Sequence, residues 1–389
     1  MPPLAIHTGR ALTPLAEIPD ALILVEDGQI RAIGPRSGME LPPGAQEMDA
    51  RGLTAAPGFV DVHIHGAAGR DAMEATPEAL AGMAACIGRH GTTSFVATTV
   101  SAPVERTQRS LEGLAGAIRG QSASPRAAAE CLGVHLEGPF LSAARRGVHP
   151  AEHLIAPSPA TLAKFLTAAE GFARILTLAP ELAGAAETIT AARAAGLVVA
   201  MGHTDATYSD AVRAIELGAR HAAHVFNAMR PFSHRETGVI GAVLTDPRVT
   251  AEVIADGVHV DDPALRLLLA AKSAEQVLLV SDGTAATEMP DGEYQLGSIE
   301  VTVSGGVCRN REGRIAGSTL TLDRAVRRMV ALGVPLAAAV QMAGFNPARL
   351  LGIESRKGRL AAGAEADIVL LDEGVNVSRV FARGREIPK

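Results

Sequence analysis

The segment PGFVDVHIHG, residues 57–66, holds the first of eight short apolar runs that decide the fold of this chain. Amphipathic helical stretches separate most of the runs, for example residues 76–89, where Pro77 stands in the first turn, and residues 208–217. Because alternating strands and helices form parallel sheets, eight repeats predict an α/β fold, a (β/α)8 TIM-type barrel of roughly 250 residues. The runs span residues 58–66, 92–100, 131–140, 174–181, 197–206, 221–229, 249–260 and 276–285.

A doubly wound open sheet is the alternative architecture for this pattern. Such a sheet carries a glycine-rich phosphate-binding turn after its first strand, and the GxGxxG pattern is absent from this chain. The barrel is therefore the favoured prediction, and residues 293–314 are expected to form an inserted hairpin after its eighth strand.

Each end of the chain holds short strand-like runs around a tight turn, formed by Glu26-Asp27-Gly28 at one end and Arg383-Gly384 at the other. An isolated two-stranded hairpin is only marginally stable, so both ends are expected to pair into one small β-domain of residues 1–56 and 357–389. The barrel then occupies residues 57–356, and two independent appendages are the alternative. The runs lie at residues 21–25, 29–33, 366–371, 378–382 and 386–387.

The composition predicts a soluble cytoplasmic protein. At roughly 150 residues per domain, 389 residues suggest two or three domains, and a 47% hydrophobic content supports a large core. The net charge of −6 and the 3% aromatic content exclude a nucleic-acid surface. No apolar run approaches the roughly 20 residues that cross a bilayer, so no membrane partner is expected. Three scattered cysteines fit a reducing compartment.

The carboxyl ends of the predicted strands carry the candidate site, because barrel enzymes build their active sites there. His63 and His65 are two apart on the first strand, so they face the same side and can converge on one metal ion. A structural role would be an equal alternative for that pair alone, but four further strand ends carry His, Glu or Asp, which favours a divalent metal site. Those residues are Glu137, His203, His224 and Asp282.

Six motifs surround the predicted strand ends: PGFVDVHIHG (57–66), HLEGPFL (135–141), GHTDA (202–206), HVFNAM (224–229), DGVHV (256–260) and VSDGTA (280–285). With these motifs the chain resembles the N-acetylglucosamine-6-phosphate deacetylases of the amidohydrolase superfamily. The pair HLEGP and HxFNAM is typical of these deacetylases, whereas HxH alone marks the superfamily. The resemblance implies a barrel with a small β-sandwich domain built from both chain ends.

The resemblance also implies a metal centre. Glu137, His203 and His224 match the core metal ligands of the family. His63 and His65 match the HxH of members that bind a second ion, whereas other relatives use a single ion. We expect one or two divalent ions per subunit, with zinc as the favoured metal and iron, cobalt or manganese as alternatives.

Asp282 matches the catalytic aspartate of the family. A divalent ion lowers the pKa of its bound water from 15.7 toward about 7, and a nearby carboxylate can take the proton and later deliver it to the departing amine. His259 matches a histidine that contacts substrate and stabilises the carbonyl oxygen as it gains charge.

The resemblance places Asn227, Ala228 and Arg235 around a sugar phosphate, for which a guanidinium beside peptide N–H donors is chemically suited. In the family the counterpart of Arg235 reaches in from a neighbouring subunit, which implies a homodimer. Further matches to substrate-contacting positions are Val148, His149, Ile315, Ala316 and Gly317.

The other histidines receive simpler interpretations. His135 shares a strand face with Glu137, so it is either a support for the ligands or a packed core residue, whereas His221 is expected to be structural. No chemical role is predicted for the remaining four, which are His7, His90, His153 and His234.

The predicted reaction is metal-dependent hydrolysis of the acetamide of N-acetyl-D-glucosamine 6-phosphate to D-glucosamine 6-phosphate and acetate. N-acetylgalactosamine 6-phosphate or another amino sugar is the alternative substrate. Cyclic-amide hydrolases are disfavoured because they often use a carboxylated lysine as the metal bridge, where this chain has Glu137. A non-enzymatic assembly protein is disfavoured because such relatives usually lose the ligands that are present here.

Overall fold

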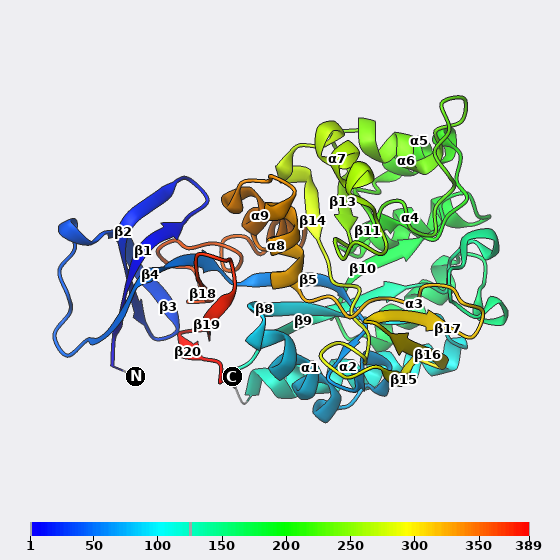
Figure 1. Ribbon diagram of the computed structural model, residues 1–389. Coiled ribbons are helices and arrows are strands. Elements are labelled where there is room, and N and C mark those ends of the chain that lie inside the picture. Colours follow the sequence, from blue (N-terminus) through cyan, green and yellow to red (C-terminus); the bar gives the residue numbers. More distant parts are fainter. Residues whose placement is uncertain (1, 124–126, 389) are drawn as a thin grey trace.

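The computed structural model describes residues 2–123 and 127–388 and confirms the predicted barrel. Eight parallel strands form one sheet in the order β14-β13-β12-β11-β10-β9-β8-β5 (Figure 1). A parallel bridge between Ile64 and Gly283 brings the two edges together, which closes the barrel. The strands are β5 (Phe59–Ile64), β8 (Thr92–Thr98), β9 (Glu130–Glu137), β10 (Ala173–Leu178), β11 (Val198–Met201), β12 (His221–Ala222), β13 (Thr250–Val253) and β14 (Val277–Leu279).

Helices surround the barrel, and the two helices named from the sequence are present. The Thr76 side chain accepts the backbone N–H of Ala79 and Pro77 is the first residue of α1, which explains where that helix begins. The helices are α1 (Pro77–Arg89), α2 (Val104–Ala123), α3 (Pro159–Ala168), α4 (Ala185–Ala194), α5 (Tyr208–Leu217), α6 (Gly238–Thr245), α7 (Asp262–Ala271), α8 (Leu322–Ala331), α9 (Leu336–Ala343) and α10 (Phe345–Leu350). Within the described ranges, no helix is long and apolar enough to cross a membrane.

The barrel strands are shorter than the apolar runs that predict them. The runs at residues 197–206 and 221–229 contain only the four residues of β11 and the two residues of β12. The reason is backbone conformation: His203 has φ 48° and His224 has φ 26°. These left-handed values end a strand and turn each imidazole over the mouth of the barrel.

Both chain ends form one seven-stranded sheet, shown in blue and red in Figure 1, in the order β20-β19-β18-β4-β1-β2-β3. The sheet folds over a shared apolar core. In addition, Ile30 N donates to Ala364 O at 2.8 Å, and this hydrogen bond joins β3 to the segment before β18. The predicted β-sandwich is confirmed, while the domain boundaries at 1–56, 57–356 and 357–389 stay a prediction. The strands are β1 (Leu4–Leu12), β2 (Glu17–Glu26), β3 (Gln29–Pro35), β4 (Gln46–Pro57), β18 (Ile368–Leu371), β19 (Val377–Ala382) and β20 (Arg385–Glu386).

The insertion after β14 is an antiparallel sheet of three strands rather than a simple hairpin. Its strands are β15 (Gly292–Leu296), β16 (Ile299–Ser304) and β17 (Val307–Asn310). The inner face of the insertion has a small apolar core of its own, which includes Val100 of the barrel and packs against Val148. The insertion therefore lies beside the mouth of the barrel.

Candidate metal centre and substrate pocket

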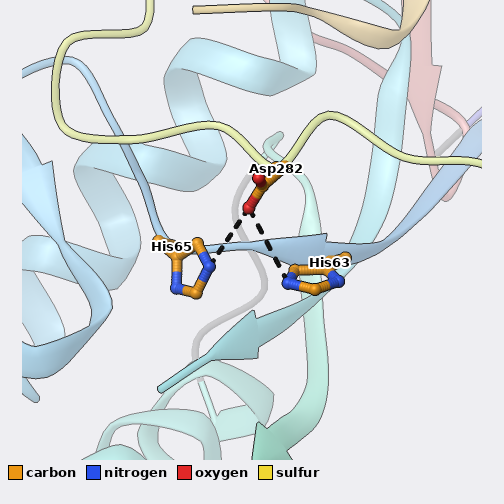
Figure 2. A group of neighbouring side chains, drawn as sticks. All are labelled: His63, His65 and Asp282. Carbon is orange, nitrogen blue, oxygen red and sulfur yellow. Dashed lines mark ion pairs between the residues drawn. The ribbon is translucent and has the colours of Figure 1, made fainter. Parts of the chain in front are cut away.

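The polar residues predicted at the strand ends converge at the mouth of the barrel. Figure 2 shows His63 on β5 and His65 just beyond the end of that strand, with the Asp282 carboxylate facing both rings. Asp282 Oδ1 lies 3.2 Å from His65 Nε2 and 3.7 Å from His63 Nε2. Asp282 follows β14 and has φ 51°, so the same left-handed turn that ends two other strands also aims this carboxylate.

Glu137 is the centre of the cluster. Its Oε1 lies 3.0 Å from His224 Nε2, 3.1 Å from His203 Nε2 and 3.3 Å from His63 Nε2. Its Oε2 lies 3.4 Å from His65 Nε2. Four imidazoles from three separate strands therefore point their Nε2 atoms at one buried carboxylate.

The hydrogen bonds on the opposite ring nitrogens identify the rings that can bind a metal ion. His65 Nδ1 lies 3.2 Å from Thr98 O, and His203 Nδ1 lies 3.1 Å from Arg145 O. A carbonyl oxygen only accepts, so each Nδ1 carries the proton and each Nε2 keeps its lone pair for a metal. His63 Nε2 is buried without a hydrogen-bond partner in the described part of the chain. This donor set fits the divalent ion that the sequence predicts.

The ring of His149 also faces the cluster, but its proton lies on the other ring nitrogen. The backbone N–H of Ser101 donates to His149 Nδ1 at 3.2 Å, so this nitrogen is an acceptor and the neutral ring carries its proton on Nε2. That Nε2 lies 3.3 Å from Glu137 Oε2. His149 is thus a hydrogen-bond donor at the edge of the site.

The pKa values follow from burial and from the pairing of opposite charges. Burial raises the pKa of Glu137, but the surrounding imidazoles, first His63 and then His203, hold it well below its usual range. Asp282 is likewise buried, and its hydrogen bond to His65 lowers its pKa. Burial lowers the pKa of His203 to about 4, whereas the two carboxylates raise the pKa of His65 to about 9 against the effect of burial.

A pocket of about 200 Å³ lies directly above this cluster. The metal-facing side chains form its floor, and several loops together with the end of strand β15 form its walls. None of the described residues that line it is Lys or Arg. The lining residues are His65, Val100, Glu137, Gly147, Val148, His149, His203, His224, Asn227, Ala228, His259, Asp282, Leu296, Ile315 and Gly317.

Comparison with known proteins identifies the family. Residues 54–387 match the amidohydrolase family model. The N-acetylgalactosamine-6-phosphate deacetylase of Escherichia coli O157:H7 is 38% identical over 98% of each chain, and the N-acetylglucosamine-6-phosphate deacetylase of Homo sapiens is 37% identical over 87% of this chain and 84% of its own. A mutant N-acetyl-D-glucosamine-6-phosphate deacetylase from Mycobacterium smegmatis, solved in complex with N-acetyl-D-glucosamine-6-phosphate, superposes with a TM-score of 0.92 at 37% identity and 100% coverage of both chains. The chain belongs to the N-acetylglucosamine-6-phosphate deacetylase family of amidohydrolases.

Most of the predicted site residues of this amidohydrolase line the pocket, but three do not. His63 lies beneath the floor and is fully buried. Ala316 packs in the core of the insertion, while its neighbours Ile315 and Gly317 face the pocket. Arg235 is exposed on the turn of residues 233–236, away from its own pocket.

Several residues of the amidohydrolase site were not predicted from the sequence. Val100 and Leu296 form apolar walls, and Ser101 orients His149. Long-range packing brings these residues to the pocket, and no local pattern marks them. Glu252 was also missed, although an acidic residue inside the apolar run 249–260 was a readable signal.

Proposed function

We propose that this chain hydrolyses the acetamide of N-acetyl-D-glucosamine 6-phosphate, with Asp282 as general base and acid. The observation that carries the proposal is the convergence of the Nε2 atoms of His203 and His224 on Glu137, with Asp282 facing the adjacent HxH pair. Glu137, His203 and His224 would hold one divalent ion, and His63 and His65 would share a second. Zinc fits these nitrogen and oxygen donors.

The chemistry divides between the ion and the side chains. A bound divalent ion polarises the acetamide carbonyl and lowers the pKa of water toward about 7. Asp282 is held ionised by its neighbours, so it can take the proton of the attacking water and return it to the leaving nitrogen. His259, whose Nδ1 lies 2.7 Å from Asp256 Oδ2, is fixed in orientation at the pocket wall and there stabilises the carbonyl oxygen.

The phosphate requires a cation, and none of the described residues that line the pocket supplies one. We propose that Arg235 of a partner subunit fills this role in a homodimer, beside Asn227 and Ala228. Its exposed position on a short turn supports that assignment. Val148, His149, Ile315 and Gly317 would contact the sugar. The three cysteines are unpaired and buried, in keeping with an enzyme of the cytoplasm.

N-acetyl-D-galactosamine 6-phosphate is the second candidate substrate. The bacterial relative named for that epimer is 38% identical over 98% of this chain, whereas the glucosamine relatives are 34–38% identical over 87–94% of it. The two sugars differ only in configuration at C4, so the pocket walls, rather than the metal-facing residues, would distinguish them.

Acetate release from a panel of three sugars tests the proposal: the two N-acetylated epimers with phosphate, and N-acetyl-D-glucosamine without it. We expect metal-dependent release that is fastest with N-acetyl-D-glucosamine 6-phosphate and far slower without the phosphate. Elemental analysis of the same sample identifies the metal. Equal rates with and without phosphate would contradict the substrate assignment, and a purified protein that retains no divalent metal would contradict the mechanism.

Arg235→Ala tests the shared site. This variant should raise KM for the phosphorylated sugar, because a charged hydrogen bond to the phosphate is lost. Its KM for the unphosphorylated sugar should not change. A chain that sediments as a monomer at full activity would contradict the dimer.

A further inference from the structure

A fully buried acidic residue lies behind the metal-facing histidines and is absent from the reaction described above. Glu252 lies on β13, and its side chain has no exposed surface. Its Oε2 lies 2.9 Å from His63 Nδ1 and accepts the backbone N–H of His224 at 3.1 Å. Its Oε1 lies 2.7 Å from His221 Nε2.

Burial of a lone carboxylate is costly, and stability alone does not account for this one. Apolar side chains of similar volume are often neutral or stabilising where they replace buried ionic groups. Glu252 nevertheless lies among three donors, one on β5, one on β12 and one just after β12. Thr250 Oγ1 lies 2.7 Å from the other ring nitrogen of His221. Its carboxylate therefore has a fixed orientation.

The contact with His63 decides which of its ring nitrogens keeps a lone pair. A carboxylate only accepts hydrogen bonds, so the proton of His63 lies on Nδ1, and the lone pair of Nε2 is left to bind a metal. Without Glu252, that proton could move to Nε2 and bond to Glu137 Oε1, 3.3 Å away, which would remove the ligand. The His135 ring packs against His63 at a centroid separation of 4.6 Å and limits its sideways movement.

His63 differs from His65 and His203 in the partner of its Nδ1 atom. The Nδ1 atoms of His65 and His203 face neutral backbone carbonyls, whereas that of His63 faces a carboxylate. A carboxylate partner raises the basicity of a ligating imidazole, and loss of such a partner typically weakens metal affinity about 10–100-fold. The same carboxylate also holds the backbone of His224, at the point where that residue leaves β12.

We propose that Glu252 is a positioning residue that fixes His63, through its Nδ1 proton, as a metal ligand. This inference rests on the proposed function, because it takes the cluster to be a metal site. It assigns to Glu252 a role in metal affinity and none in contact with substrate.

The test compares metal binding by E252Q, H63N and the control E181Q. Glu181 is a half-buried acidic residue at the same end of the barrel. Its carboxylate accepts hydrogen bonds from Thr204 Oγ1 and Asp205 N and has no hydrogen bond with any of the described metal-facing rings. The proteins are stripped of metal and titrated with Zn²⁺ by calorimetry and with Co²⁺ by visible absorption. H63N should abolish one metal-binding step. E252Q should weaken the metal affinity of that same step about 10–100-fold, while E181Q should bind metal as the unaltered chain does.

Two results would overturn the proposal: a folded E252Q with unaltered Zn²⁺ affinity, or an H63N variant that loses no binding step. If E252Q fails to fold, ¹⁵N spectra of the metal-free, histidine-labelled unaltered chain decide the matter. His63, identified by its missing signals in H63N, should be the Nδ1–H tautomer, and an Nε2–H tautomer overturns the proposal. Acetate release by the unaltered chain tests the proposed function separately, so failure of either is distinguishable.

Discussion

A buried ion cluster anchors the base of strand β9 to the segment that leads into the small sheet. Lys357 is 1% exposed, and its Nζ lies 2.8 Å from Glu130 Oε2, 2.6 Å from Glu365 Oε2 and 2.7 Å from Asp367 Oδ2. Arg356 and Arg383 also pair with Glu130. Three cations therefore balance three carboxylates, and we predict that Lys357→Met destabilises the protein.

The magnitude follows from what each carboxylate retains. Glu130 and Glu365 keep Arg356, at 3.2 Å and 2.6 Å, whereas Asp367, only 2% exposed, keeps a backbone hydrogen bond from Arg383. Removal of one partner from a buried pair costs about 3–5 kcal/mol, and the retained hydrogen bond favours the lower end. For a chain of this length the unfolding entropy is roughly 0.8 kcal/mol/K, so Tm should fall by about 4 °C.

Thermal unfolding, followed by circular dichroism at pH 7, measures this change. Lys164→Met, which removes an exposed lysine on α3, is the matched control and should leave Tm unchanged. Adding Asp367→Asn to Lys357→Met should restore at least half of the loss, because it removes the uncompensated charge. A shift below about 1 °C for Lys357→Met, or no recovery in the double variant, would refute the reasoning.

Three further predictions concern the site and its surroundings. Asp282→Asn should lower kcat about 10²–10⁴-fold at unchanged metal content, measured by acetate release and elemental analysis; near-normal turnover removes this residue from the mechanism. Gly317→Ala should lower kcat at least about 10-fold, because a Cβ at φ +57° would lie 2.5 Å from Thr284 Cγ2 and 2.8 Å from Asp282 O. Gly305→Ala, at φ +58° in open space, is its control. Equal kcat values for the two variants would contradict the prediction. Burial lowers the pKa of Lys272 to about 8, below its value in the unfolded chain, so urea unfolding should show stability rising from about pH 8 to 10.5, and Lys272→Met should abolish that rise.

The sequence sufficed for the barrel and for most of the site because both depend on local patterns. Eight apolar runs separated by helices leave few topologies, and the ends of parallel strands must meet at one edge. The positions of His203 and His224 at the mouth therefore follow from the sequence pattern alone. The lengths of their strands do not, because the left-handed turns at these residues depend on the contacts of the mouth itself.

Sequence patterns could not predict the residues whose roles depend on contacts with distant parts of the chain. Ser101 is a small polar residue in a loop, and only its approach to His149, 48 positions away, gives it a role. Leu296 reaches the pocket because the insertion packs there. The side chain of Glu252 was visible in the sequence, but its function depends on which ring it faces.

The sheet inserted after β14 separates two tasks that many sites combine. The metal-facing side chains come from the barrel strands, whereas Leu296 and Ile315 belong to the insertion and its return, and Arg314 of that return holds the opposite wall through Gly147 O at 3.0 Å. Most of the buried side chains in its apolar core belong to the insertion itself, so its surface can change while the barrel remains intact. The metal-facing residues and the pocket wall thus belong to different parts of the chain. Exchange of residues 292–317 between relatives therefore offers a route to a new sugar preference while the metal-facing residues stay unaltered.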